Sequence, residues 1–216
     1  MNFLVLATFI YFVIWLNFTL HRIAIKKGKL EKSYWEKEIM SNSVRKKSLD
    51  GLDYISIPMD KLPFGVLTDQ PEVSECETVL KELSGEKIVN LTGISNTDLK
   101  LMYGTANITP LSAYDQNYTT LVCTLQKWAQ ILFDAAYYTE AATVLEFALS
   151  TGTDIQASYR LLARLYQSRL SLSEEEFRER IGSMTETASK LRSLSKTPIL
   201  QYLQDLLEEE GQISFK

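Results

Sequence analysis

The sequence predicts an all-α protein in which an N-terminal transmembrane helix is followed by a domain of helical hairpins. Three observations predict this fold class. Residues 3–20 carry no formal charge, glycine and proline are sparse between residues 111 and 210, and apolar residues recur there at helical spacing with an offset of 34. The same region has no alternation of apolar and polar residues, which is the pattern typical of strands.

Residues 3–20 predict the membrane anchor. As a helix, these 18 residues would measure roughly 27 Å, close to the ~30 Å hydrocarbon core of a bilayer. A cleaved signal peptide would need basic residues before the apolar run and small residues at a cleavage site. The chain instead begins Met1-Asn2, and the bulky Phe18 and Arg22 stand where small residues would be needed. We therefore predict an uncleaved anchor over residues 1–25.

The charges that flank the anchor predict its orientation. Basic residues directly follow the apolar run and none precedes it, so the positive-inside rule predicts a single-pass protein of the cell (plasma) membrane, with the N-terminus outside and the rest in the cytoplasm. The rival interpretation is an exterior domain glycosylated at the sequons of Asn90, Asn107 and Asn117. The residues that we expect at the membrane surface are Arg22, Lys26, Lys27, Lys29 and Lys32.

Residues 26–48 are predicted to form a basic juxtamembrane helix. Residues 1–48 contain nine basic and three acidic residues, a net charge of +6, whereas residues 49–216 carry a net charge of −10. Two interpretations remain open. The helix either contacts anionic lipid at the inner surface, or is a solvated stalk whose charges only set the topology. Because the chain is tethered to a membrane, we predict no nucleic-acid partner.

Residues 49–71 predict an extended strap. Three of the five prolines of the chain, Pro58, Pro63 and Pro71, fall here. The apolar residues between them are too numerous for a disordered tether, so we expect the strap to pack on the helical body. A short edge strand over residues 54–57 is the alternative.

Residues 72–216 are predicted to form the all-α domain. An amphipathic helix is expected over residues 72–84. A short helix is expected over residues 98–103, with Thr97 as its N-cap and Gly104 as its stop signal. A break over residues 107–110 is expected to separate it from the long helices that follow.

An internal repeat organises the long helices. A second helix over residues 139–149 would turn back near Tyr137 and bury Ala141, Leu145 and Ala148. In the next unit, Ser173 and Glu176 form a capping-box pattern, ahead of a stripe formed by Ile181, Met184, Ala188 and Leu191. A last helix is expected from Thr197 to residue 210. With an offset of 34, the first helices align Leu125 with Tyr159, Trp128 with Leu162, Ala129 with Ala163, and Leu132 with Tyr166.

This pattern resembles the tetratricopeptide repeat family, whose 34-residue helix–turn–helix unit has such large and small positions. The resemblance covers residues 122–193, about a third of the chain. Thr153 replaces the family's proline, and the turn over residues 168–173 is long. The anchor, basic stretch and strap, with DYISIP and LPFG, also resemble an uncharacterised family of single-span bacterial membrane proteins. That second resemblance implies no activity.

The tetratricopeptide resemblance implies a binding groove lined by the first helices. Arg160 and Arg164 are four residues apart, so they share a helix face and could hold a partner that carries carboxylates. Alternatively, both are solvated or pair with nearby acids. The strap over residues 54–67 could also fill this groove. The residues implied for the groove are Gln126, Gln130, Phe133, Asp134, Arg160, Arg164 and Gln167.

The sequence shows no catalytic constellation. His21 is the only histidine and lies within the predicted anchor, at the edge of its apolar run. This removes Ser-His-Asp and Cys-His pairs and histidine-bound metals from the rest of the chain. We therefore predict no enzyme activity, metal or cofactor, and favour a membrane-anchored interaction module, an adaptor or assembly factor with a protein or peptide partner. The alternative is an enzyme that uses carboxylates alone, such as residues 174–176 or Asp134 with Glu140. The sequence leaves the oligomeric state open.

Overall fold

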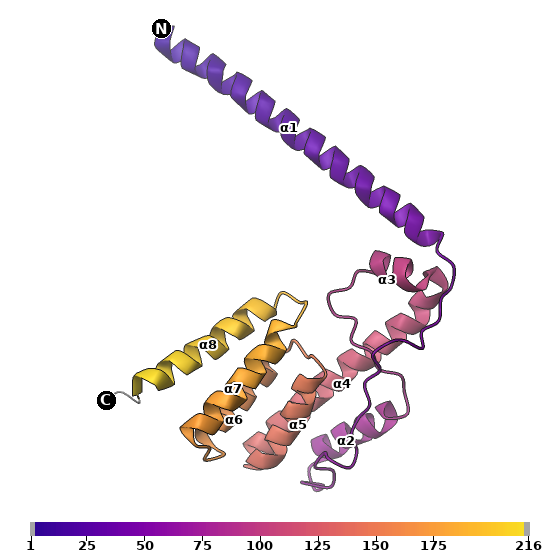
Figure 1. Cartoon of the computed structure of the whole chain (residues 1–216), viewed down its shortest axis with the longest axis vertical. Coiled ribbons are helices and arrows are strands. Elements are labelled where there is room, and N and C mark those ends of the chain that lie inside the picture. Colours follow the sequence, from indigo (N-terminus) through magenta and orange to yellow (C-terminus); the bar gives the residue numbers. More distant parts are fainter. Residues whose placement is uncertain (1–2, 214–216) are drawn as a thin grey trace. The chain divides into compact units, whose positions relative to one another are not determined.

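The computed structural model describes residues 3–213, and it describes their side chains except those of residues 3–6, 28–30 and 209–213. Within this range the chain is helical and contains no strand, so the predicted all-α class is confirmed (Figure 1). The chain divides into two compact units. Unit 1 comprises residues 1–49 with Ser95–Ile108, and unit 2 comprises Asp50–Ile94 with the residues from Thr109 onward.

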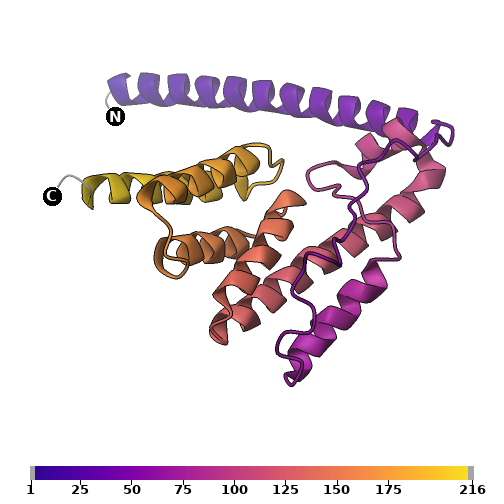
Figure 2. The ribbon, with the colours of Figure 1, turned by 60° about the horizontal axis from the view of Figure 1, so that its bottom comes forward.

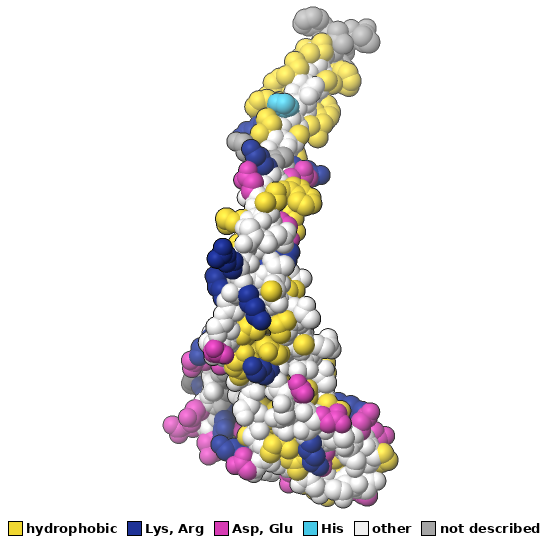
Figure 3. Space-filling view, turned by 90° about the vertical axis from the view of Figure 1, so that its right-hand side faces the viewer, with side chains coloured by type: hydrophobic (Ala, Val, Ile, Leu, Met, Phe, Trp, Pro, Cys, Tyr) yellow, Lys and Arg dark blue, Asp and Glu magenta, His cyan; other side chains and the backbone are white. Residues whose placement is uncertain are grey.

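Unit 1 is built on one uninterrupted helix, α1 (Phe3–Asn42). Its 40 residues correspond to about 60 Å at ~1.5 Å per residue. The helix runs through both the predicted anchor and most of the predicted juxtamembrane segment, and residues 43–48 lie beyond its end. By length and composition, α1 is able to cross a membrane. Figure 3 shows apolar side chains over the N-terminal half of α1 and Lys and Arg side chains toward its C-terminal end.

The short helix α3 (Asn96–Tyr103) packs on the C-terminal end of α1. Lys100 forms an ion pair with Glu38, and the hydroxyl of Thr97 donates to the same carboxylate at 2.6 Å. Lys37 pairs with Asp98 at 2.7 Å. The hydrogen bonds from Lys100 and Thr97 lower the pKa of Glu38, and those from Lys37 and Ser95 lower the pKa of Asp98. We call this contact between α1 and α3 the α1–α3 junction.

Two details of the helix boundaries near α3 differ from the prediction. Ser95, rather than Thr97, is the N-cap, because its hydroxyl accepts a hydrogen bond from the Asp98 N–H at 3.2 Å. Gly104 ends α3 as predicted, but the expected break over residues 107–110 is wrong. The 3-10 turn η1 (Thr105–Asn107) leads directly into α4 (Ile108–Asp134). Pro110 is tolerated in the first turn of α4, where its missing N–H has no helical acceptor.

Unit 2 contains the remaining helices, and the C-terminal ones pack on each other in sequence. Within it, α5 packs on α6 and α7, α6 packs on α7 and α8, and α7 packs on α8. Figures 1 and 2 show α2 beside α4, and an ion pair between Glu75 and Lys127 at 2.6 Å joins these two helices. The bounds not yet given are α2 (Pro71–Leu83), α5 (Tyr138–Ser150), α6 (Gln156–Ser168), α7 (Glu174–Ser189) and α8 (Lys196–Ile213).

The residues that the internal repeat aligned form the core of unit 2. All eight residues of the four aligned pairs are buried, including Trp128 and Tyr159, which are fully inaccessible. The expected inner stripes of α5 and α7 are buried as well, namely Ala141, Leu145, Ala148, Ile181, Met184, Ala188 and Leu191. The burial expected from the helical spacing is therefore confirmed.

The strap packs on this core, as predicted. Ile57 and Leu62 are buried in it, and the ring of Phe64 lies 5.3 Å from that of Trp128 on α4. The alternative of a short edge strand over residues 54–57 is wrong, because Tyr54 forms only an isolated bridge with Val89. An extended segment rich in proline lacks the N–H groups for a longer ladder.

The predicted capping box at the start of α7 is confirmed and leads to a first prediction. The Ser173 hydroxyl accepts from the Glu176 N–H at 3.3 Å, and the Glu176 carboxylate accepts from the Ser173 N–H at 2.9 Å. We expect Ser173→Ala to lower the free energy of unfolding by about 1 kcal/mol, because the mutation leaves the α7 N-terminus uncapped. Urea unfolding of the full chain in detergent, followed by circular dichroism, measures this loss. Ser183→Ala, on the exposed face inside α7, is the control, and an equal loss there would contradict the capping role.

Candidate binding surfaces

The structure brings the predicted groove residues of α4 and α6 together on neighbouring helices. The Ser158 hydroxyl on α6 donates to the side-chain carbonyl of Gln126 on α4 at 2.6 Å. Gln130 donates to Asp134 within α4 at 2.9 Å. Gln126, which is half-buried, therefore helps to join the helices, while Gln130, Asp134 and Gln167 are exposed.

The two predicted arginines lie over aromatic rings from neighbouring helices. The guanidinium carbon of Arg160 lies 5.0 Å from the ring centre of Tyr202 on α8, and that of Arg164 lies 6.0 Å from Phe133 on α4. Both arginines are exposed, and neither forms an ion pair within the described part of the chain. Of the predicted alternative, pairing with nearby acids is therefore not what the structure shows, whereas solvated arginines agree with their exposure.

These contacts define one surface, which we call the α4–α6–α8 surface. It comprises the predicted groove residues together with Tyr202, which the sequence analysis missed. The signal for Tyr202 was an aromatic residue in the last expected helix, for which the sequence predicted no part in the groove. None of the contacts that the structure gives Arg160 or Arg164 involves the strap, whose Phe64 contacts Trp128.

The predicted membrane-surface residues are spread along the middle of α1. Arg22 lies over the ring of Phe18 at 5.7 Å, and Lys26 is exposed. Lys27 and Lys32 approach Glu31 and Glu36 at 3.9 Å, as exposed pairs one helical turn apart, which are weak interactions. The remaining predicted residue, Lys29, has a side chain outside the described ones.

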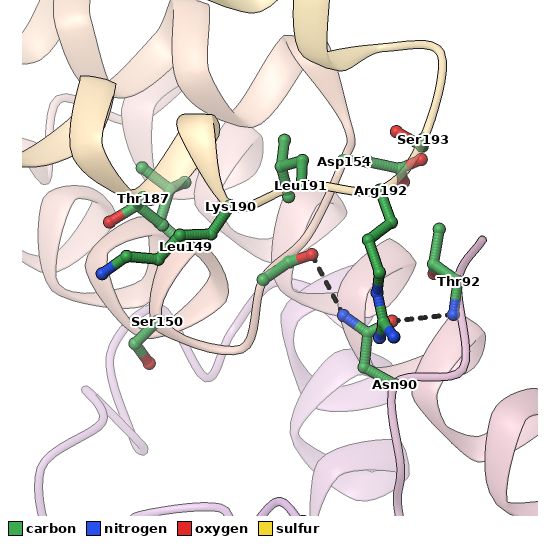
Figure 4. Close-up of a pocket in the computed structure, with 11 residues that line it drawn as sticks. Asn90, Thr92, Leu149, Ser150, Asp154, Thr187, Lys190, Leu191, Arg192 and Ser193 are labelled. Carbon is green, nitrogen blue, oxygen red and sulfur yellow. Dashed lines mark hydrogen bonds between the residues drawn. The ribbon is translucent and has the colours of Figure 1, made fainter. Parts of the chain in front are cut away.

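Unit 2 also contains a cavity that the sequence analysis did not predict. It measures about 280 Å³ and lies where the loop of residues 90–92 meets the ends of α5 and α7 (Figure 4). A second hollow of about 450 Å³ adjoins it along strap residues 53–56. The two share Asn90, Ser150, Gly152 and Arg192. We call the first of them the Asn90–Arg192 cavity.

Asn90 holds the walls of this cavity together. Its side-chain N–H groups face the Tyr118 hydroxyl at 2.9 Å and the carbonyls of Thr151 and Gly152 at 3.1 Å. Its carbonyl accepts from the Thr92 N–H at 3.0 Å. Burial raises the pKa of Tyr118, so this hydroxyl stays neutral. A single amide side chain thus links the loop of residues 90–92, α4 and the end of α5.

The three sequon asparagines outside the anchor all use their side-chain N–H groups inside the fold. Asn107 is fully buried and donates to the carbonyls of Lys47 and Tyr103, both at 2.7 Å. Asn117 donates to the Lys87 carbonyl at 3.1 Å, and Asn90 is engaged as described above. Because a glycan is attached through this same nitrogen, glycosylation of Asn107 would remove these contacts and require its exposure.

No group of three or more His, Cys, Asp and Glu side chains suited to a metal ion occurs among the described residues. No family model matches the chain, and neither a curated protein nor a solved structure matches it.

Proposed function

We propose that this protein is a membrane-anchored interaction module, an adaptor or assembly factor that presents its helical domain to a protein or peptide partner at the cytoplasmic side of the cell membrane. The observation that carries the proposal is the α4–α6–α8 surface. On it, two exposed guanidinium groups lie over rings supplied by neighbouring helices. An exposed arginine that lies over a ring is pre-organised for a partner, because the ring restricts its rotamers and leaves its N–H edge accessible.

The proposed fold of this domain is a tetratricopeptide-like array. In it, α4 with α5 and α6 with α7 are the two hairpins, and α8 is the cap. The burial of all eight residues aligned by the 34-residue offset supports this assignment, as does the packing of α6 on both α7 and α8. In such an array the first helices of the hairpins line the binding side, and one of them, α6, carries both arginines.

The proposed topology is a single span with the N-terminus outside. The apolar helix α1 and the basic residues that follow its apolar part support the topology. The engaged side chains of Asn90, Asn107 and Asn117 argue against the rival arrangement, in which an exterior domain would carry glycans at these positions.

The proposed partner carries carboxylates that reach Arg160 and Arg164. Residues four apart on a helix have Cβ atoms about 5–6 Å from one another, which suits two neighbouring carboxylates or one carboxylate held from both sides. Charge-assisted hydrogen bonds of this kind contribute about 1.5–3 kcal/mol each. Gln130, which is exposed on the neighbouring helix α4, supplies a further amide group.

Affinity capture from detergent-solubilised membranes, with mild crosslinking, tests this proposal. We expect a partner to be recovered with the full chain, and we expect the double variant Arg160→Gln/Arg164→Gln to recover at least about tenfold less of it. The matched control is Arg178→Gln, which changes an arginine of unit 2 that pairs with Glu174 instead. Recovery of the chain alone, or equal recovery by the double variant and the control, would contradict the proposal.

A further inference from the structure

Arg192 differs from the other arginines of unit 2. Arg192 itself has neither a ring nor a carboxylate partner among the described residues. It lies two residues past Lys190, the C-cap of α7. The arginines that do have such a partner are Arg160 over Tyr202, Arg164 over Phe133, Arg169 over Tyr138, Arg178 with Glu174, and Arg180 with Glu146.

The backbone of Arg192 is held in place by the loop that carries Gly93. Gly93 has a φ of +79°, and a Cβ at this position would lie 2.7 Å from the Arg192 Cβ and 2.8 Å from its carbonyl oxygen. Only glycine therefore permits this approach. The close contact fixes the start of the Arg192 side chain against the loop of residues 90–94, although the side chain itself is exposed.

The side chain of Arg192 runs toward Asn90 and Thr92, as Figure 4 shows. It lines both the Asn90–Arg192 cavity and the adjoining hollow. Asn90 has no further N–H to offer, since its amide group already serves Tyr118 and the end of α5. The Thr92 hydroxyl makes no hydrogen bond within the described part of the chain. The cavity thus offers two hydrogen-bond donors to a ligand, the guanidinium group of Arg192 and the hydroxyl of Thr92.

The other charged groups of the cavity do not neutralise Arg192. Lys190 points away from it in Figure 4 and pairs with Glu186 at 2.8 Å. Asp154 is half-buried and lines the cavity without forming an ion pair with any described residue. Burial, and to a lesser extent the charge of Asp154, raises the pKa of Tyr159 to about 12, so Asp154 lies close enough to influence that hydroxyl.

We propose that the Asn90–Arg192 cavity binds the oxyanion of a small ligand, a phosphate or carboxylate group, with Arg192 as the main donor and the Thr92 hydroxyl as the second. A guanidinium group matches both oxyanions because two of its N–H groups can donate in parallel. A cavity of about 280 Å³ limits the ligand to a small molecule. Asp154 repels the bound anion, which sets an upper limit on the affinity. This site is separate from the α4–α6–α8 surface, so either proposal can fail without the other.

The test is an NMR titration of the full chain, labelled with ¹⁵N, in detergent micelles. The probes are inorganic phosphate and sodium acetate, and sodium chloride at matched ionic strength is the reference. We expect saturable shifts of the Thr92, Gly93, Gly152 and Ser193 amides. Arg192→Gln should weaken the affinity at least about tenfold, because it removes charge-assisted hydrogen bonds. Asp154→Asn should strengthen it several-fold, since it removes the opposing charge.

Two control variants test whether anion binding depends on Arg192 itself or on the positive charge of the domain in general. Lys190→Gln removes a cation from the same cavity that points away from Arg192, and Arg178→Gln removes an arginine from outside it. We expect both to change the affinity less than twofold. Saturation by phosphate alone assigns a phosphate-bearing ligand, and saturation by acetate alone assigns a carboxylate. If neither anion shifts these amides more than chloride, or if Arg192→Gln binds as the unchanged protein does, the proposal is overturned.

Discussion

Replacing Trp128 by alanine will lower the free energy of unfolding by about 3–5 kcal/mol, the usual cost of deleting a fully buried aromatic side chain. Trp128 is completely inaccessible to solvent. It lies on α4 in the core of unit 2, with the ring of Phe64 from the strap 5.3 Å away. Its loss leaves a large cavity and removes the surface on which the strap rests. Thermal or urea unfolding of the full chain in detergent, followed by circular dichroism, measures the effect.

Two further tryptophan variants make this prediction specific. Trp35→Ala changes the same residue type in unit 1, where the side chain is 60% exposed, and should leave the unfolding of unit 2 unchanged. Trp128→Phe should cost much less than Trp128→Ala. It keeps most of the ring, and it removes an indole N–H that has no hydrogen-bond partner among the described residues. Equal losses for Trp128→Ala and Trp35→Ala would show that Trp128 does not anchor the core.

Replacing Gly104 by alanine will destabilise the α1–α3 junction by more than about 2 kcal/mol. Gly104 has φ +87° and ψ +150°, a conformation that costs other residues about 1–3 kcal/mol. A Cβ at this position would also overlap the carbonyl of Arg45 and lie 2.9 Å from the Lys46 Cα. Since both obstacles are backbone atoms, no side-chain rotation relieves the clash. Hydrogen exchange of α3 and η1 in the full chain should therefore become faster.

Two control variants at other glycines separate the cost of the backbone conformation from the cost of the steric clash. Gly65→Ala has a similar φ of +84° but open space around the added methyl group, so it reports the conformational cost alone. Gly182→Ala, inside α7 with open space, should be neutral or stabilise by up to about 1 kcal/mol, because alanine favours the helix. If Gly104→Ala costs no more than Gly65→Ala, the close packing at Gly104 does not hold the junction.

The helical spacing of apolar residues in the sequence correctly predicted the core of unit 2. The residues of the aligned pairs, such as Ala129 with Ala163, are buried because helical spacing alone decides which residues share a face. The capping box of Ser173 with Glu176 was likewise predictable, since it joins residues only three apart. The strap was predicted to pack because its apolar residues are too many for an extended segment in water.

Local pattern was less reliable where a residue has a partner far away in the sequence. Thr97 looked like a helix cap, but in the structure its hydroxyl donates to Glu38, 59 residues earlier. Asn107 and Pro110 looked like a break, yet Asn107 is buried and bonds to Lys47, and α4 begins at the next residue. In both cases the side chain bonds to a residue far away in the sequence, which the local pattern does not record.

The candidate binding surfaces likewise combine a feature that the local sequence predicts with contacts that it does not. The shared face of Arg160 and Arg164 follows from their spacing of four residues. The rings under them come from α8 and α4, and no sequence pattern predicted the register of those helices against α6. The Asn90–Arg192 cavity could not be predicted from the sequence, because its walls come from residues 90–92, 149–154 and 187–193, which share no pattern.

The sequence by itself therefore determined the all-α class, an N-terminal helix apolar enough to cross a membrane, and the residues that form the core. These properties depend on composition and on the period of a single helix. Only the tertiary structure decided that α1 continues unbroken to Asn42 and that α3 closes on its end through Glu38 and Lys100. It also decided that Arg192, beside Asn90, has neither a ring nor a carboxylate partner among the described residues. These contacts form because loops bring together residues that are far apart in the sequence. The periodicity of apolar residues carries no information about such contacts.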